Sequence, residues 1–145
     1  MERVKLKILK LVESATLPLY AHEDDSGLDL FAIEPKEILP GKTALIRTGI
    51  AIEIPMGTEA QVRPRSGLAL KHAITVLNTP GTVDAGYRGE IGVVLINHGE
   101  QPFQVEQGMK IAQMVIAPVL KAEIEQVDQL SETDRGQGGY GSTGV

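Results

Sequence analysis

Hydrophobic and polar residues alternate in short runs along this chain. The alternation has a period of two in residues 4–8 (VKLKI), 50–54 (IAIEI) and 58–63 (TEAQVR), as expected of β-strands with one solvated face. Residues 91–98 (IGVVLINH) and 110–120 (KIAQMVIAPVL) are apolar almost throughout, which predicts strands buried on both faces. The pattern therefore predicts many short strands.

Proline interrupts the chain so often that few windows can hold a helix of about 12 residues. It stands at positions 18, 35, 40, 55, 64, 80, 102 and 118. The exception is residues 66–72 (SGLALKH), which predict a short helix with Ser66 as its N-cap. Short strands with turn signals about every ten residues favour a sandwich, barrel or jelly roll. We therefore expect an all-β fold, a distorted jelly roll or β-barrel of short strands with one short helix.

The chain has 145 residues and no internal repeat or interdomain linker, which fits one domain. After Leu130 the composition changes to SETDRGQGGYGSTGV, a segment with almost nothing to bury. We expect a β domain over residues 1–130 and a flexible, Gly-rich C-terminal arm over residues 131–145.

Composition removes several classes of protein. The chain has no Cys, which excludes disulfide scaffolds, cysteine zinc sites and thiol nucleophiles. No run approaches the roughly 20 apolar residues that a membrane span requires, so we expect no membrane association. The formal net charge of -5 argues against sequence-independent nucleic-acid binding, which needs a basic surface. Residues 1–14 (MERVKLKILKLVES) lack a signal-peptide cleavage site, so we expect a cytoplasmic protein.

The arm contains the first candidate for chemistry. Residues 136–141 (GQGGYG) have the GxGxxG spacing, but no strand precedes them and no helix follows, and Ser142 stands where a Walker lysine would be. Free backbone N–H groups, hydroxyls and Arg135 could still hold a phosphate. The alternative is a disordered tail, against which Arg135 and Tyr140 argue because a spacer needs neither.

A second candidate is GTVDAGYRGE, residues 81–90, where glycines surround Asp84 and Tyr87. The structural interpretation is a β-hairpin in which Asp84 caps the turn and Tyr87 packs nearby. In the functional interpretation, Asp84 is a general base for water and Tyr87 offers a flat face to a sugar or base ring.

A third candidate is RPRSGLALKH, residues 63–72, where two arginines and a serine meet at a strand-to-helix junction that favours an anion. A solvated turn is the alternative. Asp29 in SGLDL, residues 26–30, lies between apolar residues and could equally be a turn or strand-edge residue. The three histidines have no metal-ligand spacing.

Taken together and in this order, SGLDL, PRSGL, NTPGTVDAGYRGE, KIAQ and RGQGGYGSTG resemble the five successive motifs of the homotrimeric dUTP diphosphatases (dUTPases). The resemblance extends from about residue 20 to residue 144, and its third and fifth motifs are long and specific. Two positions depart from the family pattern: Lys110, where the fourth motif often carries Arg, and Tyr140, where the arm usually carries Phe. Lys110 keeps the positive charge of Arg, and Tyr140 keeps the aromatic ring of Phe.

The resemblance implies hydrolysis of dUTP to dUMP and pyrophosphate with Mg²⁺, which limits uracil in DNA and supplies dUMP for dTMP synthesis. Asp84 matches the general base that orients a water for attack on the α-phosphorus. Tyr87 matches the residue that packs under the deoxyribose and leaves no room for a 2′-hydroxyl. Asn78, expected in the strand leading into the hairpin, matches a position that reads uracil beside backbone groups such as that of Gly81.

Other motifs match positions on the phosphate side of the substrate. Ser66, with Arg65 and Gly67 in the same loop, matches a contact to the α,β-bridging region. Gln113 matches a hydrogen-bonding position near the phosphates. Asp29 matches an acidic residue associated with the metal through water, as suits an ion that keeps several of its waters.

In the arm, Arg135, Gly141, Ser142 and Thr143 match residues that close over the γ-phosphate, and Tyr140 is expected to stack on uracil. The resemblance also implies a homotrimer whose active sites are shared between subunits. Two alternatives stay open at this point. One is a dCTP deaminase with a related fold, and the other is a non-catalytic nucleotide-binding protein on the same scaffold.

Overall fold

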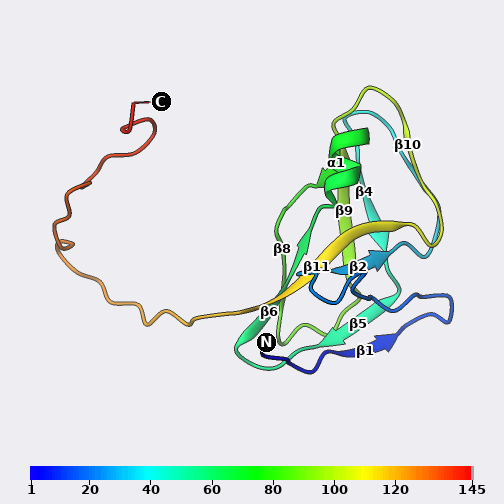
Figure 1. Ribbon diagram of the computed structural model, residues 1–145, viewed down its shortest axis with the longest axis horizontal. Helices are drawn as coiled ribbons and strands as arrows, with labels where there is room; N and C mark the ends of the chain where they lie inside the picture. Colours follow the sequence, from blue (N-terminus) through cyan, green and yellow to red (C-terminus); the bar gives the residue numbers. More distant parts are fainter. Residues whose placement is uncertain (145) are drawn as a thin grey trace.

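β-strands make up nearly all of the regular structure, as the alternating pattern predicts (Figure 1). The computed structural model describes residues 1–144. Its only α-helix in that range is α1 (Ser66–His72). The strands are β1 (Lys7–Lys10), β2 (Leu28–Phe31), β3 (Lys36–Ile38), β4 (Thr43–Arg47), β5 (Ile50–Glu53), β6 (Thr58–Arg63), β7 (Ile74–Val76), β8 (Gly81–Asp84), β9 (Gly92–Asn97), β10 (Phe103–Val105) and β11 (Lys110–Pro118).

All strand pairs are antiparallel, and they form four small sheets. The largest has the order β2-β11-β6-β8, and a three-stranded sheet has the order β4-β9-β7. The pairs β1-β5 and β10-β3 complete the set. Within residues 1–144 these sheets do not close into a barrel, so the jelly-roll form of the prediction is confirmed.

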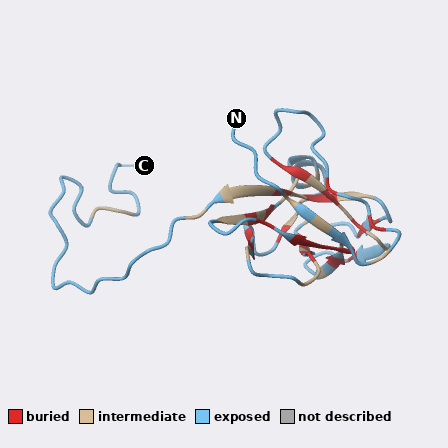
Figure 2. Cartoon of the chain, turned by 90° about the horizontal axis from the view of Figure 1, so that it is seen from below, coloured by how far each residue is buried: buried red, intermediate tan, exposed pale blue. Residues whose placement is uncertain are grey.

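One hydrophobic cluster joins the sheets, with buried residues gathered inside the body of the molecule (Figure 2). Leu30, Ala60 and Met114 enter it from the four-stranded sheet, and Ile46 and Leu95 enter it from the three-stranded sheet. Because inward and outward side chains alternate along a strand, the outer face of each sheet is left free to carry polar groups.

Two expectations about local structure are only partly right. Burial on both faces was predicted for residues 91–98 and 110–120, but Val94 and Ile96 in β9 and Val115 in β11 are half-buried. The N-terminal strand begins at Lys7 rather than at Val4, because pairing with β5 starts only at the Lys7–Glu53 register.

Helix α1 is present where it was predicted, but Ser66 is not its N-cap. Arg65 takes the extended N-cap conformation, and no side chain caps the helix. Because the backbone of Arg65 is extended, with φ -94° and ψ 131°, Ser66 is the first helical residue. The Ser66 side chain is exposed and is not used in capping.

The predicted hairpin over residues 81–90 is wrong. Although Tyr87 N donates to the carbonyl of Asp84 and closes a turn, β8 pairs with β6, and β9 pairs with β4 and β7. The two flanking strands therefore belong to different sheets. A jelly roll passes strands from sheet to sheet in this way, and sequence proximity does not reveal the change.

Beyond β11 the chain leaves the body. Figure 1 shows this segment reaching far from the sheets, and all residues from Leu120 to Ser131 are exposed. Val145, the last residue of the predicted arm, lies outside the described residues. Within residues 1–144, no helix has the length and apolar character needed to cross a bilayer.

Candidate functional site

A cavity of about 310 Å³ brings together five of the predicted site residues. It lies between β2, β11 and the start of α1. The predicted residues in its lining are Asp29, Arg65, Ser66, Gly67 and Gln113. We call it the cationic cavity, because Arg65 is joined there by Lys110. The remaining lining residues come from the loop before β2.

Asp29 lies between the two cations of this cavity. Lys110 Nζ is 3.2 Å from one carboxylate oxygen, and Arg65 Nε is 3.8 Å from the other. Arg65 Nη1 also donates to the carbonyl of Lys110 at 3.3 Å. The Asp29 side chain is only 13% exposed, so solvent weakens these interactions less than at an open surface. The three residues thus hold one another in place.

Lys110 is the functional candidate that the sequence interpretation missed. In a regular strand with period two, Lys110 and Gln113 would point to opposite faces. The pairing of β11 with β2 shifts register between Lys110 and Ala112, so an extra residue is accommodated and both side chains line the cavity. Lys110 is the first residue of the KIAQ motif, but only the bulge in β11 places its side chain beside Asp29.

Gln113 stands opposite Asp29 in the β11–β2 pair. Its Nε2 donates to the carbonyl of Pro64 at 3.0 Å, which ties β11 to the loop that carries Arg65. Gly27 leaves room for this side chain, since a Cβ there would lie 3.0 Å from the Cβ of Gln113 and closer still to its Oε1. Gln113 therefore fixes the rim of the cavity and keeps one N–H free.

A second hollow, of about 200 Å³, lies at β8, which is the edge strand of the four-stranded sheet opposite β2. Asp84 and Tyr87 both line it, together with Glu90. Asp84 is the last residue of β8 and is exposed, and it forms no ion pair with any residue in the described range. Its carboxylate is therefore available to accept a hydrogen bond from water.

Asn78 and Gly81 line a smaller adjoining cavity of about 70 Å³. The two residues lie close, since a Cβ at Gly81 would be 3.4 Å from Asn78 Nδ2. Asn78 was predicted to lie in a strand, but it lies in the exposed turn between β7 and β8. The reason is that β7 ends at Val76, whose carbonyl accepts from Thr79 N in the turn. The turn aims the Asn78 amide toward the start of β8.

The cationic cavity and the Asp84 hollow are well separated within one chain. In the order β2-β11-β6-β8, Asp29 and Asp84 stand three strand spacings apart, which is roughly 14 Å. Asp84 is also displaced along the strands, since its partner Glu59 lies four residues from Arg63, which faces Gln113. Asp29 and Asp84 of one chain therefore line different hollows.

The arm contributes a third, separate group. Arg135, Tyr140, Gly141, Ser142 and Thr143 lie in the projecting segment, away from both cavities (Figure 1). The hydrogen bonds of this segment are local, such as Arg135 Nε to the carbonyl of Gly138 at 2.7 Å. Tyr140 is fully exposed and takes a positive φ of 46°.

Comparison with known proteins gives a consistent result. The family model described as dUTPase matches residues 13–144. A deoxyuridine 5'-triphosphate nucleotidohydrolase of Gloeothece citriformis is 70% identical to this chain over 142 residues, which is 98% of each chain. The relative from Clostridium tetani with the same description is 67% identical over 144 residues, 99% of each chain.

Solved structures agree with these relatives. A dUTPase of Staphylococcus bacteriophage 80alpha with dUpNHpp superposes with a TM-score of 0.92 at 29% identity, over 97% of this chain and 99% of that one. The dUTPase of phage phi11 of S. aureus, described for its coordination of a structural Mg(II) ion, gives 0.80 at 28% identity, over 86% and 97%.

Proposed function

This chain belongs to the dUTPase family, and from that premise we propose that Asp84 activates the water that attacks dUTP. The chain hydrolyses dUTP to dUMP and pyrophosphate, which excludes the deaminase and the non-catalytic protein as its main activity. One observation carries the role of Asp84: an exposed carboxylate that forms no ion pair within residues 1–144 lies in the same hollow as Tyr87. Both oxygen atoms of Asp29, by contrast, already face a cation.

In the proposed reaction, Asp84 accepts a proton from water while the water oxygen forms a bond to the α-phosphorus. The bond from this phosphorus to the oxygen that bridges it to the β-phosphorus breaks, and that oxygen leaves with pyrophosphate. The protein forms no covalent intermediate, so its contribution is positioning and electrostatic stabilisation of the developing charge.

The cationic cavity is the proposed site for the phosphate chain. Arg65 and Lys110 offer N–H donors, and the exposed hydroxyl of Ser66 and the free N–H of Gln113 add neutral ones. The backbone at Gly67 is open, because a Cβ there would meet nothing within 4 Å. These donors offset locally the net charge of -5 that would otherwise repel a triphosphate.

Nucleoside selection is assigned to the residues around β8. Tyr87 would present its ring face to deoxyribose, and a ribose 2′-hydroxyl would collide with it. Asn78 and the backbone at Gly81 border the small cavity that we assign to uracil. We expect this small cavity to accept uracil and to refuse the methyl group of thymine.

Mg²⁺ is the proposed cofactor, and the residues present fit an ion that arrives with the triphosphate. Asp25 and Asp29 line the cationic cavity, but Asp29 is already paired with cations, so its contact to a metal would pass through water. No group of three or more His, Asp or Glu in the described range could enclose an ion. Mg²⁺ suits such a site because it keeps several waters, and when bound it would neutralise phosphate charge.

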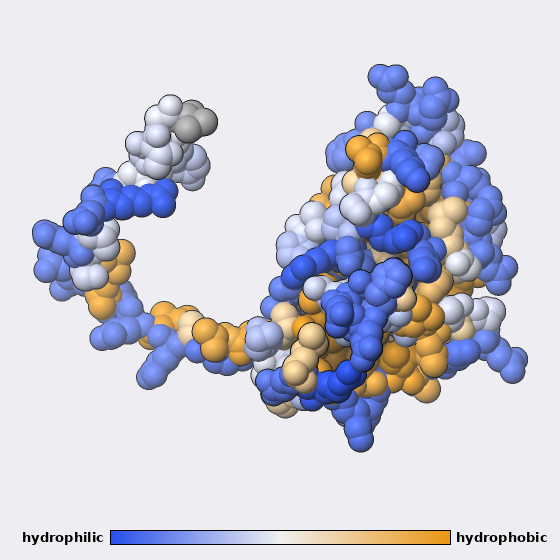
Figure 3. Space-filling view, viewed as in Figure 1, coloured by the Kyte–Doolittle hydropathy of each residue, from blue (hydrophilic) through white to orange (hydrophobic). Residues whose placement is uncertain are grey.

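A homotrimer with shared active sites is the proposed assembly. It is supported by the separation of the cationic cavity, the Asp84 hollow and the arm within one chain. It is also supported by apolar side chains on the projecting segment (Figure 3). Leu120, Ile124 and Leu130 are 96%, 94% and 84% exposed, and a second copy of the chain would cover them.

The arm, residues 131–145, is proposed to close over the bound nucleotide. Arg135, Ser142 and Thr143 would contact the γ-phosphate and Tyr140 would stack on uracil. Because the arm lies free of the body, it can fold down after substrate binds, exclude water and complete the site. We propose that the enzyme acts in the cytoplasm.

Pyrophosphate release from dUTP, dTTP, dCTP and UTP tests this function, with Asp84→Asn as the decisive variant. We expect kcat for dUTP to fall by about 10²–10⁴, the usual contribution of a positioned general base. Binding of a non-hydrolysable dUTP analogue should survive, because Asn keeps the size of the side chain. Asp128→Asn, an exposed change outside the three groups, is the matched control. If Asp84→Asn turned over dUTP as fast as the control, Asp84 would not be the general base.

A further inference from the structure

The Tyr87 ring is held in one orientation by its own loop. Its hydroxyl donates to the carbonyl of Glu90 at 2.9 Å, and its backbone N donates to the carbonyl of Asp84 at 3.1 Å. Beneath the ring lies Gly89, where a Cβ would stand 2.5 Å from Cζ and 2.9 Å from Cε1 of Tyr87. No side chain fits at position 89 unless the ring moves.

The carbonyl that receives the Tyr87 hydroxyl is itself fixed from another part of the chain. The Glu90 carboxylate accepts from Arg47 Nε at 3.2 and 3.3 Å and from Arg47 Nη2 at 3.2 Å. It also accepts from the backbone N of Gly49 at 3.0 Å. The side-chain hydrogen bonds from Arg47 to Glu90, and then the charge of Glu90, raise the pKa of Arg47.

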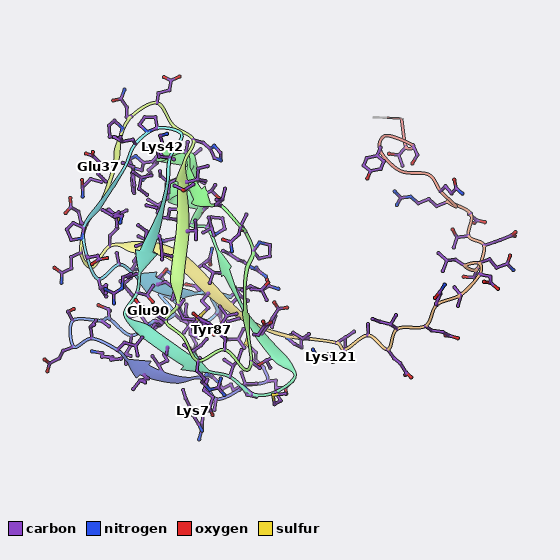
Figure 4. The ribbon with its side chains drawn as sticks, turned by 180° about the vertical axis from the view of Figure 1, so that it is seen from behind. Lys7, Glu37, Lys42, Tyr87, Glu90 and Lys121 are labelled. Atoms are coloured by element: carbon purple, nitrogen blue, oxygen red, sulfur yellow. The ribbon has the colours of Figure 1, made fainter. Side chains whose placement is uncertain are left out.

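The neighbouring backbone strengthens the same attachment. Ile91 N donates to the carbonyl of Ile50 at 2.8 Å, and the buried Thr48 hydroxyl donates to the carbonyl of Ile91 at 2.5 Å. Residues 90–91 are therefore held by the corner between β4 and β5. Figure 4 shows Tyr87 and Glu90 near each other in the same half of the body, away from Glu37.

We propose that Gly89 and the Arg47–Glu90 pair are positioning residues, which fix the Tyr87 ring in the orientation that selects deoxyribose over ribose. The inference rests on the proposed function, because it takes the Tyr87 ring as the surface under the sugar. Rejection of a single hydroxyl requires the ring to lie close to the 2′-carbon, and a ring free to turn would leave space for that hydroxyl. In this proposal Arg47 and Glu90 act through Tyr87, although Glu90 also lines the Asp84 hollow.

Two variants test the proposal, each with a matched control. Gly89→Ala forces the ring aside, whereas Gly86→Ala lies in the same turn with nothing within 4 Å of the new Cβ. Glu90→Gln removes the negative charge of the carboxylate that accepts hydrogen bonds from Arg47 and Gly49. The control Glu37→Gln removes an exposed charge at the far end of the body (Figure 4). If Gly89→Ala fails to fold, Glu90→Gln still tests the attachment.

The first readout needs no nucleotide. The chain has no Trp and 3 Tyr, so Tyr20→Phe with Tyr140→Phe leaves Tyr87 as the sole strong near-ultraviolet chromophore. In that background we expect Gly89→Ala and Glu90→Gln to weaken the near-ultraviolet circular dichroism of Tyr87. The two control variants should keep the signal. Equal signals in the test and control variants would overturn the proposal.

The second readout uses the otherwise unchanged chain, with kcat and KM measured for dUTP and for UTP. We expect the preference for dUTP to fall by roughly tenfold in Gly89→Ala and by less in Glu90→Gln, mainly through KM. An unchanged preference in both variants would contradict the proposal. If the wild-type chain does not prefer dUTP to UTP, the sugar role of Tyr87 fails, while a changed Tyr87 spectrum still supports the positioning contacts.

Discussion

Asp29 and Asp84 carry the same carboxyl group in different surroundings. Asp29 is 13% exposed and faces Lys110 and Arg65, so its charge orders two cations around the cationic cavity. Asp84 is exposed at the end of β8 and pairs with no cation in the described range. We infer that one aspartate organises phosphate binding and the other activates water.

At this residue scale, Asp29→Asn should lower kcat/KM for dUTP by about 10- to 100-fold, mostly through KM, because Lys110 and Arg65 lose the charge that positions them. Steady-state kinetics over a range of dUTP concentrations measures the effect. Asp24→Asn, an exposed change in the preceding loop, serves as control. A KM close to that of the control would show that the cations do not depend on Asp29.

At the scale of elements, helix α1 ends in a conformation that its sequence does not favour. Ala73 takes φ 56° and ψ 35° at the C-cap, where its N–H donates to the carbonyl of Ala69. The left-handed region crowds a Cβ against the following backbone, so glycine is the usual residue at such an end. The strain is tolerated because β7 begins at the next residue, Ile74, which is buried.

Ala73→Gly should therefore raise the free energy of unfolding by about 0.5–1 kcal/mol. The thermal midpoint at a fixed protein concentration measures this, since assembly makes the midpoint depend on concentration. Ala69→Gly, an exposed change in the middle of the same helix, should lower stability by about 1 kcal/mol. The same sign of shift for both variants would refute the account of Ala73.

The arm is the other element with a testable role. Deleting residues 135–145 should leave a folded core with little activity, because the body has its own hydrophobic cluster and none of residues 131–144 is buried. Circular dichroism and pyrophosphate release measure the two outcomes. Tyr140→Phe, which keeps the aromatic ring, should retain activity. An active truncated chain would show that the arm is only a spacer.

At the scale of the whole molecule, we propose that the three groups of site residues meet across subunit boundaries. Within one chain, the cationic cavity and Asp84 stand three strand spacings apart, and the arm projects away from both. A closed trimer brings surfaces of different copies together around one axis. Each active site would then combine parts of more than one chain.

Mixing two inactive variants tests this assembly. Asp84→Asn chains keep the arm, and chains lacking residues 135–145 keep Asp84. After joint unfolding and refolding in equal amounts, we expect activity to return to about a quarter of the wild-type level, since random trimers pair an intact Asp84 with an intact arm at that frequency. Each variant refolded alone is the control. No recovery in a mixture of trimers would mean that Asp84 and the arm of one site come from the same chain.

The motifs grouped residues that the structure brings together, whereas part of the strand pairing around them was predicted incorrectly. The motifs named Asp29, Arg65, Ser66 and Gln113, and these four do line one cavity. The hairpin over residues 81–90 was wrong, because period-two alternation identifies a strand but not its partner. Lys110 was not predicted to line this cavity, because a bulge in β11 is not visible in the order of residues.

By itself the sequence determined what local chemistry can determine: short strands, one helix at residues 66–72, a glycine-rich end and the motifs of the dUTPase family. The tertiary structure alone decided which side chains meet. It set Lys110 beside Asp29 through a bulge, and it joined Arg47 to Glu90 across 43 residues to fix the loop of Tyr87. Local patterns follow from the geometry of neighbouring residues, whereas these contacts depend on how distant strands pair and pack.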